Sequence, residues 1–214
     1  MNSRRIALAS LTLCITLTCL PMQVYTQQEG KPTYQSLLER VKKGDRTVDF
    51  TALRLAYSDD PPKNSGTDSE TSTKMFAALR SKDYTKAVAY AEEIMKANYV
   101  DINAHLVAAM SFHEKKEPEK ENLHRYVADG LIQSILRSGD GKSQATAFTV
   151  IDTSEEYVIL RVYGLMPGSQ GLESANGHHY DRLDAVNPKT HEKVTLYFNV
   201  DRPIGELEKI FKKQ

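Results

Sequence analysis

The chain has 214 residues, with 28 Lys or Arg and 28 Asp or Glu, so its formal net charge at pH 7 is zero. This balance provides no basic surface for nucleic acid or for an anionic membrane. Its two cysteines, Cys14 and Cys19, lie in the N-terminal segment considered next. We therefore expect no disulfide in the remainder, whose stability must come from a packed core.

The first 26 residues have the pattern of a cleaved export signal. Arg4 and Arg5 precede the uncharged run Ile6–Leu20, which is too short to span a bilayer comfortably. Pro21 ends the run, and we expect cleavage close to Gln27. No second long apolar run follows, so we predict an exported protein, periplasmic or secreted, with no membrane span once the signal is removed.

Apolar residues then recur at helical spacing as far as Ser138. The segment "TYQSLLERVKKG" predicts a helix with Thr33 as its cap and Gly44 as its stop, and "VDFTALRLAY" predicts a second short helix. The polar stretch Ser58–Glu70 contains two adjacent prolines and is predicted to be a solvated loop. Three further helices are predicted within residues 74–114, and a longer one over residues 122–138.

The segment Lys74–Glu114 resembles the tetratricopeptide repeat. Lys82-Asp83-Tyr84 and Ala87 match the Gly-Asp-Tyr, two residues, Ala pattern of the repeat, and Ala104 matches the small residue at the start of its next helix. Tyr99 stands where the repeat usually has Pro, and the match covers roughly one and a half repeats, fewer than an independent solenoid needs. The helices must therefore bury their remaining apolar faces on another part of the chain.

In the C-terminal part the apolar period changes from helical to two. We predict a hairpin made of strands Thr146–Asp152 and Glu156–Gly164, joined by a turn at residues 153–155. Two more strands, "HYDRLDAV" and "KVTLYFNV", flank the turn-rich loop Asn187–Glu192. The strands follow one another without crossover helices, which excludes an all-parallel sheet.

The chain is therefore predicted to have an α+β fold. After the signal peptide, residues 1–26, a helical, tetratricopeptide-like region spans residues 32–138. Residues 139–214 form an antiparallel sheet of about four strands, followed by a helix that begins near Pro203. We expect the helical region to pack on the apolar face of the sheet and the two regions to make one cooperative unit.

Several long motifs together resemble one protein family. They are "DFTALRLAY", "SGDGKSQATAFTVIDTSEEYVIL" and "YDRLDAVNPKTHEKVTLYFNV", and the resemblance extends from about Tyr34 to Pro203. The family consists of exported bacterial proteins and is known as domain of unknown function forty-nine nineteen. The resemblance implies an export signal and an α+β fold, and it supplies no catalytic residues.

The stretch "SGDGKSQ", residues 138–144, ends in the Gly-Lys-Ser of a phosphate-binding loop. Such a loop has Gly five residues before Gly141, where this chain has Leu136. A helix also enters and a strand leaves, the reverse of the order that points helix amides at a phosphate. We interpret the stretch as a helix end, with Gly139 or Gly141 in the left-handed conformation.

The segment "GHHYDRLD" contains weak candidates for metal ligands. Alternation along a strand places His179 and Asp181 on one face and His178 and Asp184 on the other. Two ligands on one face are too few for a closed metal site. We therefore predict no metal and no cofactor, and interpret the segment as a polar strand edge.

The sequence contains no recognisable catalytic group. Glu155 and Glu156 could act as acid and base if burial separated their pKa values, but adjacent residues at the start of a strand point to opposite faces and usually lie in solvent. His105 and His113 are interpreted as packed or exposed helix residues. No serine elbow, cysteine nucleophile or Gly-rich dinucleotide turn is present, so we predict no catalytic residue.

We expect a non-catalytic module that binds or assembles with a protein or peptide partner. An open groove beside the helical aromatic residues would favour this reading, and the candidate binding residues are Tyr84, Tyr90, Phe112, Glu156 and Tyr157. A folding or envelope-stress accessory differs from such a module mainly in its partner. The alternative is a small hydrolase or metal-assisted enzyme at the sheet edge, which would use Glu156, His179 and Asp181.

Overall fold

The computed structural model describes residues 31–61 and 69–205. The predicted signal peptide, the centre of the predicted loop at residues 62–68 and most of the predicted last helix lie outside the described residues. The described residues belong to one compact unit that includes both the helices and the sheet. Within the described part, no helix is long and apolar enough to cross a membrane.

Six α-helices form the N-terminal part. They are α1 (Tyr34–Lys42), α2 (Phe50–Asp59), α3 (Ser69–Arg80), α4 (Tyr84–Ala97), α5 (Ile102–Glu114) and α6 (Pro118–Leu136). The side chain of Thr33 caps α1, as predicted, and Asp49, Asp83 and Asp101 cap α2, α4 and α5.

Two of the predicted boundaries in this part were wrong. The loop predicted over Ser58–Glu70 is shorter, because α2 continues to Asp59 and α3 begins at Ser69. The connection before α6 is likewise shorter than predicted, because the helix that was predicted to begin at residue 122 begins at Pro118. Pro118 occupies the first turn of α6, where its missing N–H costs no hydrogen bond.

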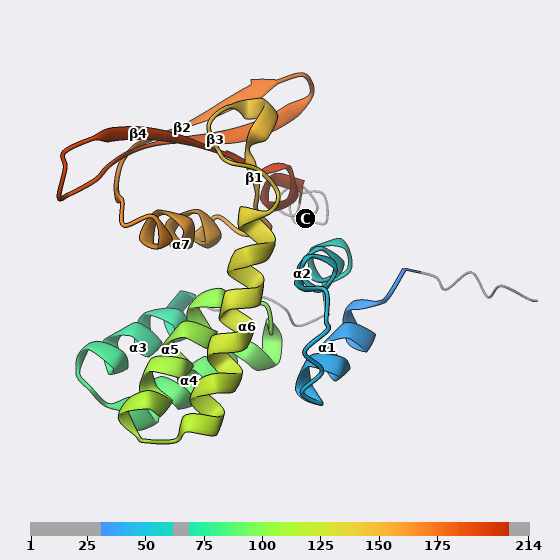
Figure 1. The fold of residues 1–214 in the computed structure, drawn as a ribbon, viewed down its shortest axis with the longest axis vertical. Coiled ribbons are helices and arrows are strands. Elements are labelled where there is room, and N and C mark those ends of the chain that lie inside the picture. Colours follow the sequence, from blue (N-terminus) through green and yellow to red (C-terminus); the bar gives the residue numbers. More distant parts are fainter. Residues whose placement is uncertain (1–30, 62–68, 206–214) are drawn as a thin grey trace, which may run out of the picture. The chain divides into compact units, whose positions relative to one another are not determined.

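Helices α3 to α6 pack consecutively on one another (Figure 1). Ala87 and Ala91 of α4 and Ala104 and Ala108 of α5 are fully buried, which lets these helices approach closely. In the turn between α3 and α4, Lys82 has a φ of 60°. It stands where the repeat pattern has glycine, the residue that adopts this conformation without strain.

The stretch "SGDGKSQ" joins the helices to the sheet, as predicted. Helix α6 precedes it, and a short 3₁₀ turn, η1 (Gln144–Thr146), and strand β1 (Phe148–Thr149) follow it. Gly141 has a φ of 69°, and a Cβ atom there would collide with the ring of Phe148. A Cβ atom on Gly139 would collide with the carbonyl oxygen of Thr146. Glycine is therefore required at both positions, because the backbone packs closely against Thr146 and Phe148 there.

The predicted hairpin of residues 146–164 was wrong. Its second strand is a helix, α7 (Ser154–Val162), and its first strand is reduced to β1. The buried residues of α7 follow helical spacing, namely Glu155, Glu156, Val158, Ile159 and Leu160. Glu155 and Glu156 are also not in solvent as predicted, with exposures of 4% and 0%.

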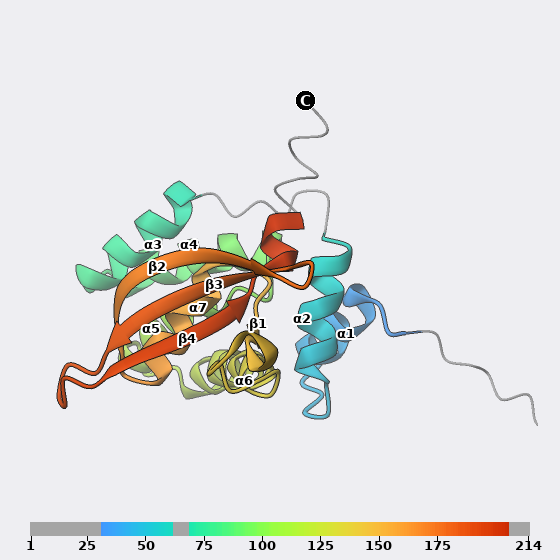
Figure 2. The same ribbon diagram turned by 90° about the horizontal axis from the view of Figure 1, so that it is seen from above.

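The remaining strands are β2 (Met166–Ala175), β3 (His178–Val186) and β4 (Lys193–Asn199). The predictions for β3 and β4 are confirmed, whereas β2 was not predicted. The sheet order is β1-β4-β3-β2 (Figure 2). β2, β3 and β4 are antiparallel, but β1 pairs parallel with β4, Phe148 opposite Phe198, so the sheet is mixed and not purely antiparallel.

The predicted α+β class is confirmed, with one layer more than expected. Helix α7 lies between the sheet and the helices α5 and α6, which it contacts (Figure 1). One face of β4 is buried, since Leu196 and Phe198 are at most 4% exposed, and Val200, directly after the strand, is 1% exposed. After β4, helical backbone resumes at residues 201–205.

Candidate functional site

An open groove of about 320 Å³ lies at the C-terminal ends of α3 and α5. Of the aromatic residues predicted to line such a groove, only Tyr84 does so. Tyr90 is half-buried against the core, and Phe112 is buried, with its ring stacked on His124 at a centroid distance of 5.5 Å. The groove lining consists of Leu79, Arg80, Lys82, Tyr84, Met110, His113, Glu114 and Arg125.

The groove combines apolar surface with positive charge. Met110 is 57% exposed and supplies apolar surface to the groove. Arg80 and Lys82 are exposed and form no ion pair with a described carboxylate, whereas Arg125 is paired with Glu121 at 2.6 Å. Sequence periodicity could not find this site, because its cations come from three separate helices and turns.

A pair of histidines lies between α5 and α6. His105 is fully buried; its Nε2 is 2.9 Å from the carbonyl oxygen of Tyr99, and its Nδ1 is 3.0 Å from Nδ1 of His124. Because a carbonyl oxygen only accepts, His105 must donate through Nε2 and accept through Nδ1. His124 therefore carries its proton on Nδ1. Desolvation lowers the pKa of His105 to about 3 and that of His124 to about 4, so both rings are neutral at pH 7.

The second candidate site is a carboxyl pair between α7 and β3. Asp181, 8% exposed, and the fully buried Glu156 both lie beside the amide of Gln170, whose Nε2 is 2.7 Å from Asp181 Oδ2 and 3.5 Å from Glu156 Oε2. Tyr157 donates its hydroxyl to Gln170 Oε1 at 3.1 Å. The structure thus brings together Glu156 and Tyr157, which were predicted to bind a partner, and Asp181, which was predicted to act with Glu156 in the alternative enzyme site. Gln170 was missed because its strand was not predicted.

Burial keeps the carboxyl group of Glu156 protonated. Desolvation, followed by the nearby Asp181 carboxylate, raises the pKa of Glu156 to about 9. Glu156 is thus a neutral acid beside Asp181 at pH 7, and its Oε1 has no hydrogen-bond partner among the described residues. This arrangement can share a proton, but neither the α3–α5 groove nor the pocket described below is lined by either residue.

Glu155 faces a different partner. Its Oε2 is 2.7 Å from Nη1 of Arg54 on α2, with both side chains at most 5% exposed, and it accepts the backbone N–H of Ile151 at 2.8 Å. Arg54 also donates to Ser134 Oγ on α6 and to the carbonyl oxygen of Thr149 on β1. Each of the three guanidinium nitrogens therefore donates a hydrogen bond at the junction of helices and sheet, which indicates a structural role.

The weak metal candidates are separated from one another. His178 Nδ1 and His179 Nδ1 lie 2.6 and 3.4 Å from the carboxylate of Asp201, whereas Asp181 contacts Gln170. Asp184 instead accepts hydrogen bonds from Ser169, Thr195 and Arg182. Among the described residues, no group of three or more His, Cys, Asp or Glu side chains is placed to hold a metal ion.

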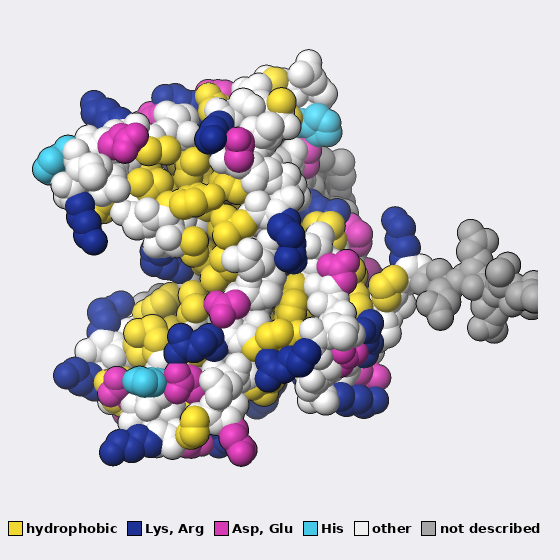
Figure 3. Space-filling view, viewed as in Figure 1, with side chains coloured by type: hydrophobic (Ala, Val, Ile, Leu, Met, Phe, Trp, Pro, Cys, Tyr) yellow, Lys and Arg dark blue, Asp and Glu magenta, His cyan; other side chains and the backbone are white. Residues whose placement is uncertain are grey.

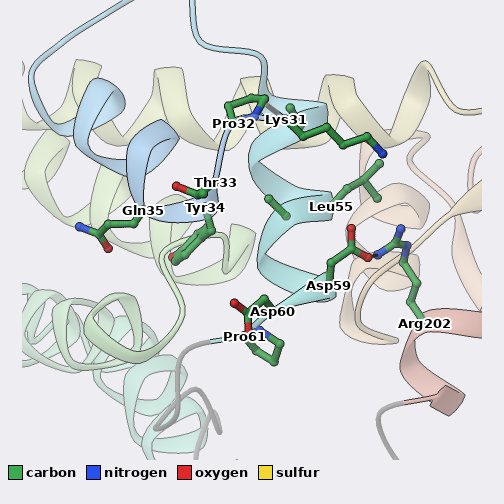
Figure 4. Close-up of a pocket in the computed structure, with 12 residues that line it drawn as sticks. Lys31, Pro32, Thr33, Tyr34, Gln35, Leu55, Asp59, Asp60, Pro61 and Arg202 are labelled. Atoms are coloured by element: carbon green, nitrogen blue, oxygen red, sulfur yellow. Dashed lines mark hydrogen bonds and ion pairs between the residues drawn. The ribbon is translucent and has the colours of Figure 1, made fainter. Parts of the chain in front are cut away.

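A larger, open pocket of about 780 Å³ lies between α1 and α2 (Figure 4). Its polar groups include Asp59, which forms an ion pair with Arg202 at 2.6 Å. Lys31 and Pro61 line this pocket and adjoin residues outside the described ranges. We therefore place no functional site there.

Comparison with protein families identifies a family for this chain, and that family has no assigned activity. Residues 23–209 match the family described as Domain of unknown function (DUF4919). No curated protein and no solved structure matches the chain. Because the match covers most of the chain, the protein belongs to the DUF4919 family, the same family that its sequence motifs resemble.

Proposed function

We propose that the protein is a non-catalytic binding module that holds an acidic segment of a protein or peptide partner in the α3–α5 groove. The observation that carries the proposal is the lining of this groove. An exposed methionine, Met110, and the aromatic Tyr84 offer apolar contact, and Arg80 and Lys82 offer cations without described ion-pair partners. Exposed apolar surface rimmed by charge is typical of peptide-binding sites.

The groove favours an acidic partner because its charge is one-sided. Arg80 and Lys82 line it together with a single carboxylate, that of Glu114, while the charge of Arg125 is paired with Glu121. Desolvation, and then that carboxylate, raises the pKa of the Tyr84 phenol, so Tyr84 stays an uncharged hydrogen-bond donor. A segment that alternates carboxylates with apolar side chains would satisfy both kinds of surface.

The test uses fluorescein-labelled peptides of alternating Glu and Leu, with Gln/Leu peptides of the same length for comparison, and fluorescence anisotropy of the mature protein. We expect the Glu/Leu peptide to bind more tightly, and added salt to weaken it. The double variant Arg80→Glu/Lys82→Glu should lose about tenfold in affinity, since each rim charge is worth about 1 kcal/mol or less. Lys96→Glu, an exposed position on α4, is the matched control.

Equal loss in the groove variant and in the Lys96→Glu control would show that general charge, and not the groove, attracts the peptide. Equal affinity for the Glu/Leu and Gln/Leu peptides would reject the acidic specificity. Met110→Lys checks the apolar contact independently of the charge. The substitution removes apolar surface from the groove while adding a cation, so weaker peptide binding could not result from lost positive charge.

We also propose that the module works outside the cytoplasm, in the periplasm or as a secreted protein. The support is the sequence pattern of residues 1–26, with Arg4 and Arg5 before an uncharged run. Amino-terminal sequencing of the protein recovered from the periplasm or medium of a producing host tests this. A chain that begins near Gln27 supports export, and an intact Met1 in the cytosolic fraction contradicts it.

A small hydrolase at the sheet edge is the second candidate, and the contact of Glu156 with Asp181 is the observation that favours it. A neutral acid beside a carboxylate is a useful catalytic combination. The burial of Glu156 and the assignment of His179 to Asp201 weigh against it. A panel of ester, glycoside and peptide substrates, with Asp181→Asn as the inactive control, would detect such an activity.

A further inference from the structure

Strand β2 leaves one edge of the sheet open. In the order β1-β4-β3-β2 it is the outermost strand, and in the described part of the chain nothing pairs with its outer side (Figure 2). The opposite edge is covered in part, because β1 pairs with β4 and the N–H of Tyr197 donates to the carbonyl oxygen of Gly141. An uncovered strand edge is a template for pairing with another chain.

The hairpin turn determines which backbone groups face outward. Asn176 and Gly177 connect β2 to β3 with φ values of 53° and 79°, as a two-residue type I′ loop requires. In such a hairpin the flanking residues, Ala175 and His178, form a hydrogen-bonded pair, and hydrogen-bonded and non-bonded pairs then alternate. It follows that Ser174, Leu172 and Gln170 direct their N–H and C=O groups away from β3.

Large apolar side chains are exposed beside this edge. Five of the six large exposed hydrophobic residues of the described chain fall between residues 157 and 172, with exposed fractions from 40% to 61%. They are Tyr157, Val162, Tyr163, Met166 and Leu172. On the face shown in Figure 3, hydrophobic side chains gather over α7 and the adjoining sheet. This amount of exposed apolar surface on neighbouring segments is typical of an interaction surface.

The devices that usually protect an edge are confined to the start of β2. Pro167 and an irregular register between Pro167 and Gln170 disturb the first residues. From Gln170 to Ala175 the register is regular, and Glu173 is the only charged residue of the stretch. The carboxylate of Glu173 already accepts a hydrogen bond from Gln144 at 2.7 Å.

We propose that two copies of this chain pair antiparallel through β2, about a two-fold axis at Leu172, and so join their sheets. In this register Leu172 lies opposite Leu172 of the second copy, Gln170 lies opposite Ser174, and Gly171 lies opposite Glu173. Every outward N–H and C=O between Gln170 and Ser174 gains a partner, and no two carboxylates oppose each other.

The edge favours a second copy because it is complementary to itself. A two-fold interface places the same patch on both subunits, so an apolar residue must lie at the axis and like charges must not meet there. Leu172, 61% exposed, satisfies the first condition, and the offset of Glu173 from the axis satisfies the second. The formal net charge of zero adds no long-range repulsion between copies.

The proposal predicts a dimer of the mature protein, measured by light scattering coupled to gel filtration at concentrations up to about 100 μM. Leu172→Lys places two cations opposite each other at the axis and should give the mass of one chain. Leu172→Pro removes the outward N–H while leaving the hydrogen bonds between β2 and β3, and should do the same. Met110→Lys, at an equally exposed apolar position on α5, is the matched control and should remain dimeric.

Circular dichroism and the thermal midpoint establish that each variant is folded, and Leu172→Lys keeps the test decisive if the proline variant unfolds. A monomeric wild-type chain at the highest concentration would overturn the proposal, as would Leu172 variants that dimerise like the wild type. The Glu/Leu peptide should still bind the Leu172 variants. Failure of peptide binding therefore rejects the groove, and failure of dimerisation rejects the β2 edge.

Discussion

Replacement of Glu156 by Gln tests whether the carboxyl pair holds a proton in the folded protein. The side chain of Glu156 is fully buried, lies beside Asp181 and has one oxygen without a partner among the described residues. Glutamine has nearly the same shape and is neutral at every pH. The substitution therefore changes the protonation of the site while keeping its packing.

The effect has a definite sign and size. An unfolded Glu has a pKa of 4.5, and burial raises that of Glu156 to about 9. Between these values the folded state binds one more proton than the unfolded state, so the free energy of unfolding falls as pH rises, by about 1.4 kcal/mol per pH unit. From pH 5 to pH 8 this amounts to about 4 kcal/mol. Because Gln loses no proton, the variant should become progressively more stable than the wild type over this range.

The assay is urea unfolding at pH 5, 6.5 and 8, followed by far-ultraviolet circular dichroism. The quantity of interest is the difference in unfolding free energy between variant and wild type, from which the contributions of Glu155, His105 and His124 cancel because both proteins contain them. Glu93→Gln, at an exposed position of α4, is the control and should give a difference independent of pH. If Glu156→Gln gave an equally flat difference, Glu156 would be ionised in the folded protein and the reasoning would be wrong.

Substitutions at Arg54 and at Gly141 test two junctions of the fold. Arg54→Met should destabilise the protein by about 3–5 kcal/mol, because it leaves the Glu155 carboxylate buried and unpaired. The double variant Arg54→Met/Glu155→Leu should recover much of that loss in urea unfolding at pH 7, and a double variant as unstable as the single one would contradict this. Gly141→Val should lower the free energy of unfolding by about 2 kcal/mol or more, because valine would have to adopt a left-handed backbone and its side chain would collide with the ring of Phe148. Lys142→Ala should change the free energy of unfolding by less than about 0.5 kcal/mol. Equal tolerance of the Gly141 and Lys142 changes in thermal unfolding would argue against this account of the junction.

The sequence predicted the helices of the N-terminal part because their buried faces are mostly apolar. It failed at α7 for a physical reason. In "EYVILRVYG" the β-branched residues favour a strand, and the two residues that complete the helical face, Glu155 and Glu156, are acidic. Carboxylates are almost never fully buried unless paired, so periodicity counted them as exposed. The partner that explains Glu155 is Arg54, 101 residues earlier in the chain.

The sequence also predicted only part of the candidate sites, because their contacts join residues that are far apart in the chain. Glu156 and Asp181 were both recognised as possible functional residues, but their contact depends on α7 packing against β3, which no local pattern reveals. Tyr84 was expected in a groove and lines one, whereas Phe112 has the same apolar character and lies in the core. The distinction between a buried and an exposed aromatic ring arises only from tertiary packing.

The position of β4 has a consequence for how the sheet forms. β4, the last of the described strands along the chain, lies in the middle of the sheet, between β1 on one side and the β2–β3 hairpin on the other. Until residues 193–199 are in place, Phe148 and the hairpin share no hydrogen bonds, and the sheet consists of two separate parts. Assembly therefore waits for contacts between residues far apart in sequence, which is a slow step in folding. The strand that is synthesised last, among those described, joins the other strands into one sheet. The sheet can therefore be completed only when nearly the whole chain is available.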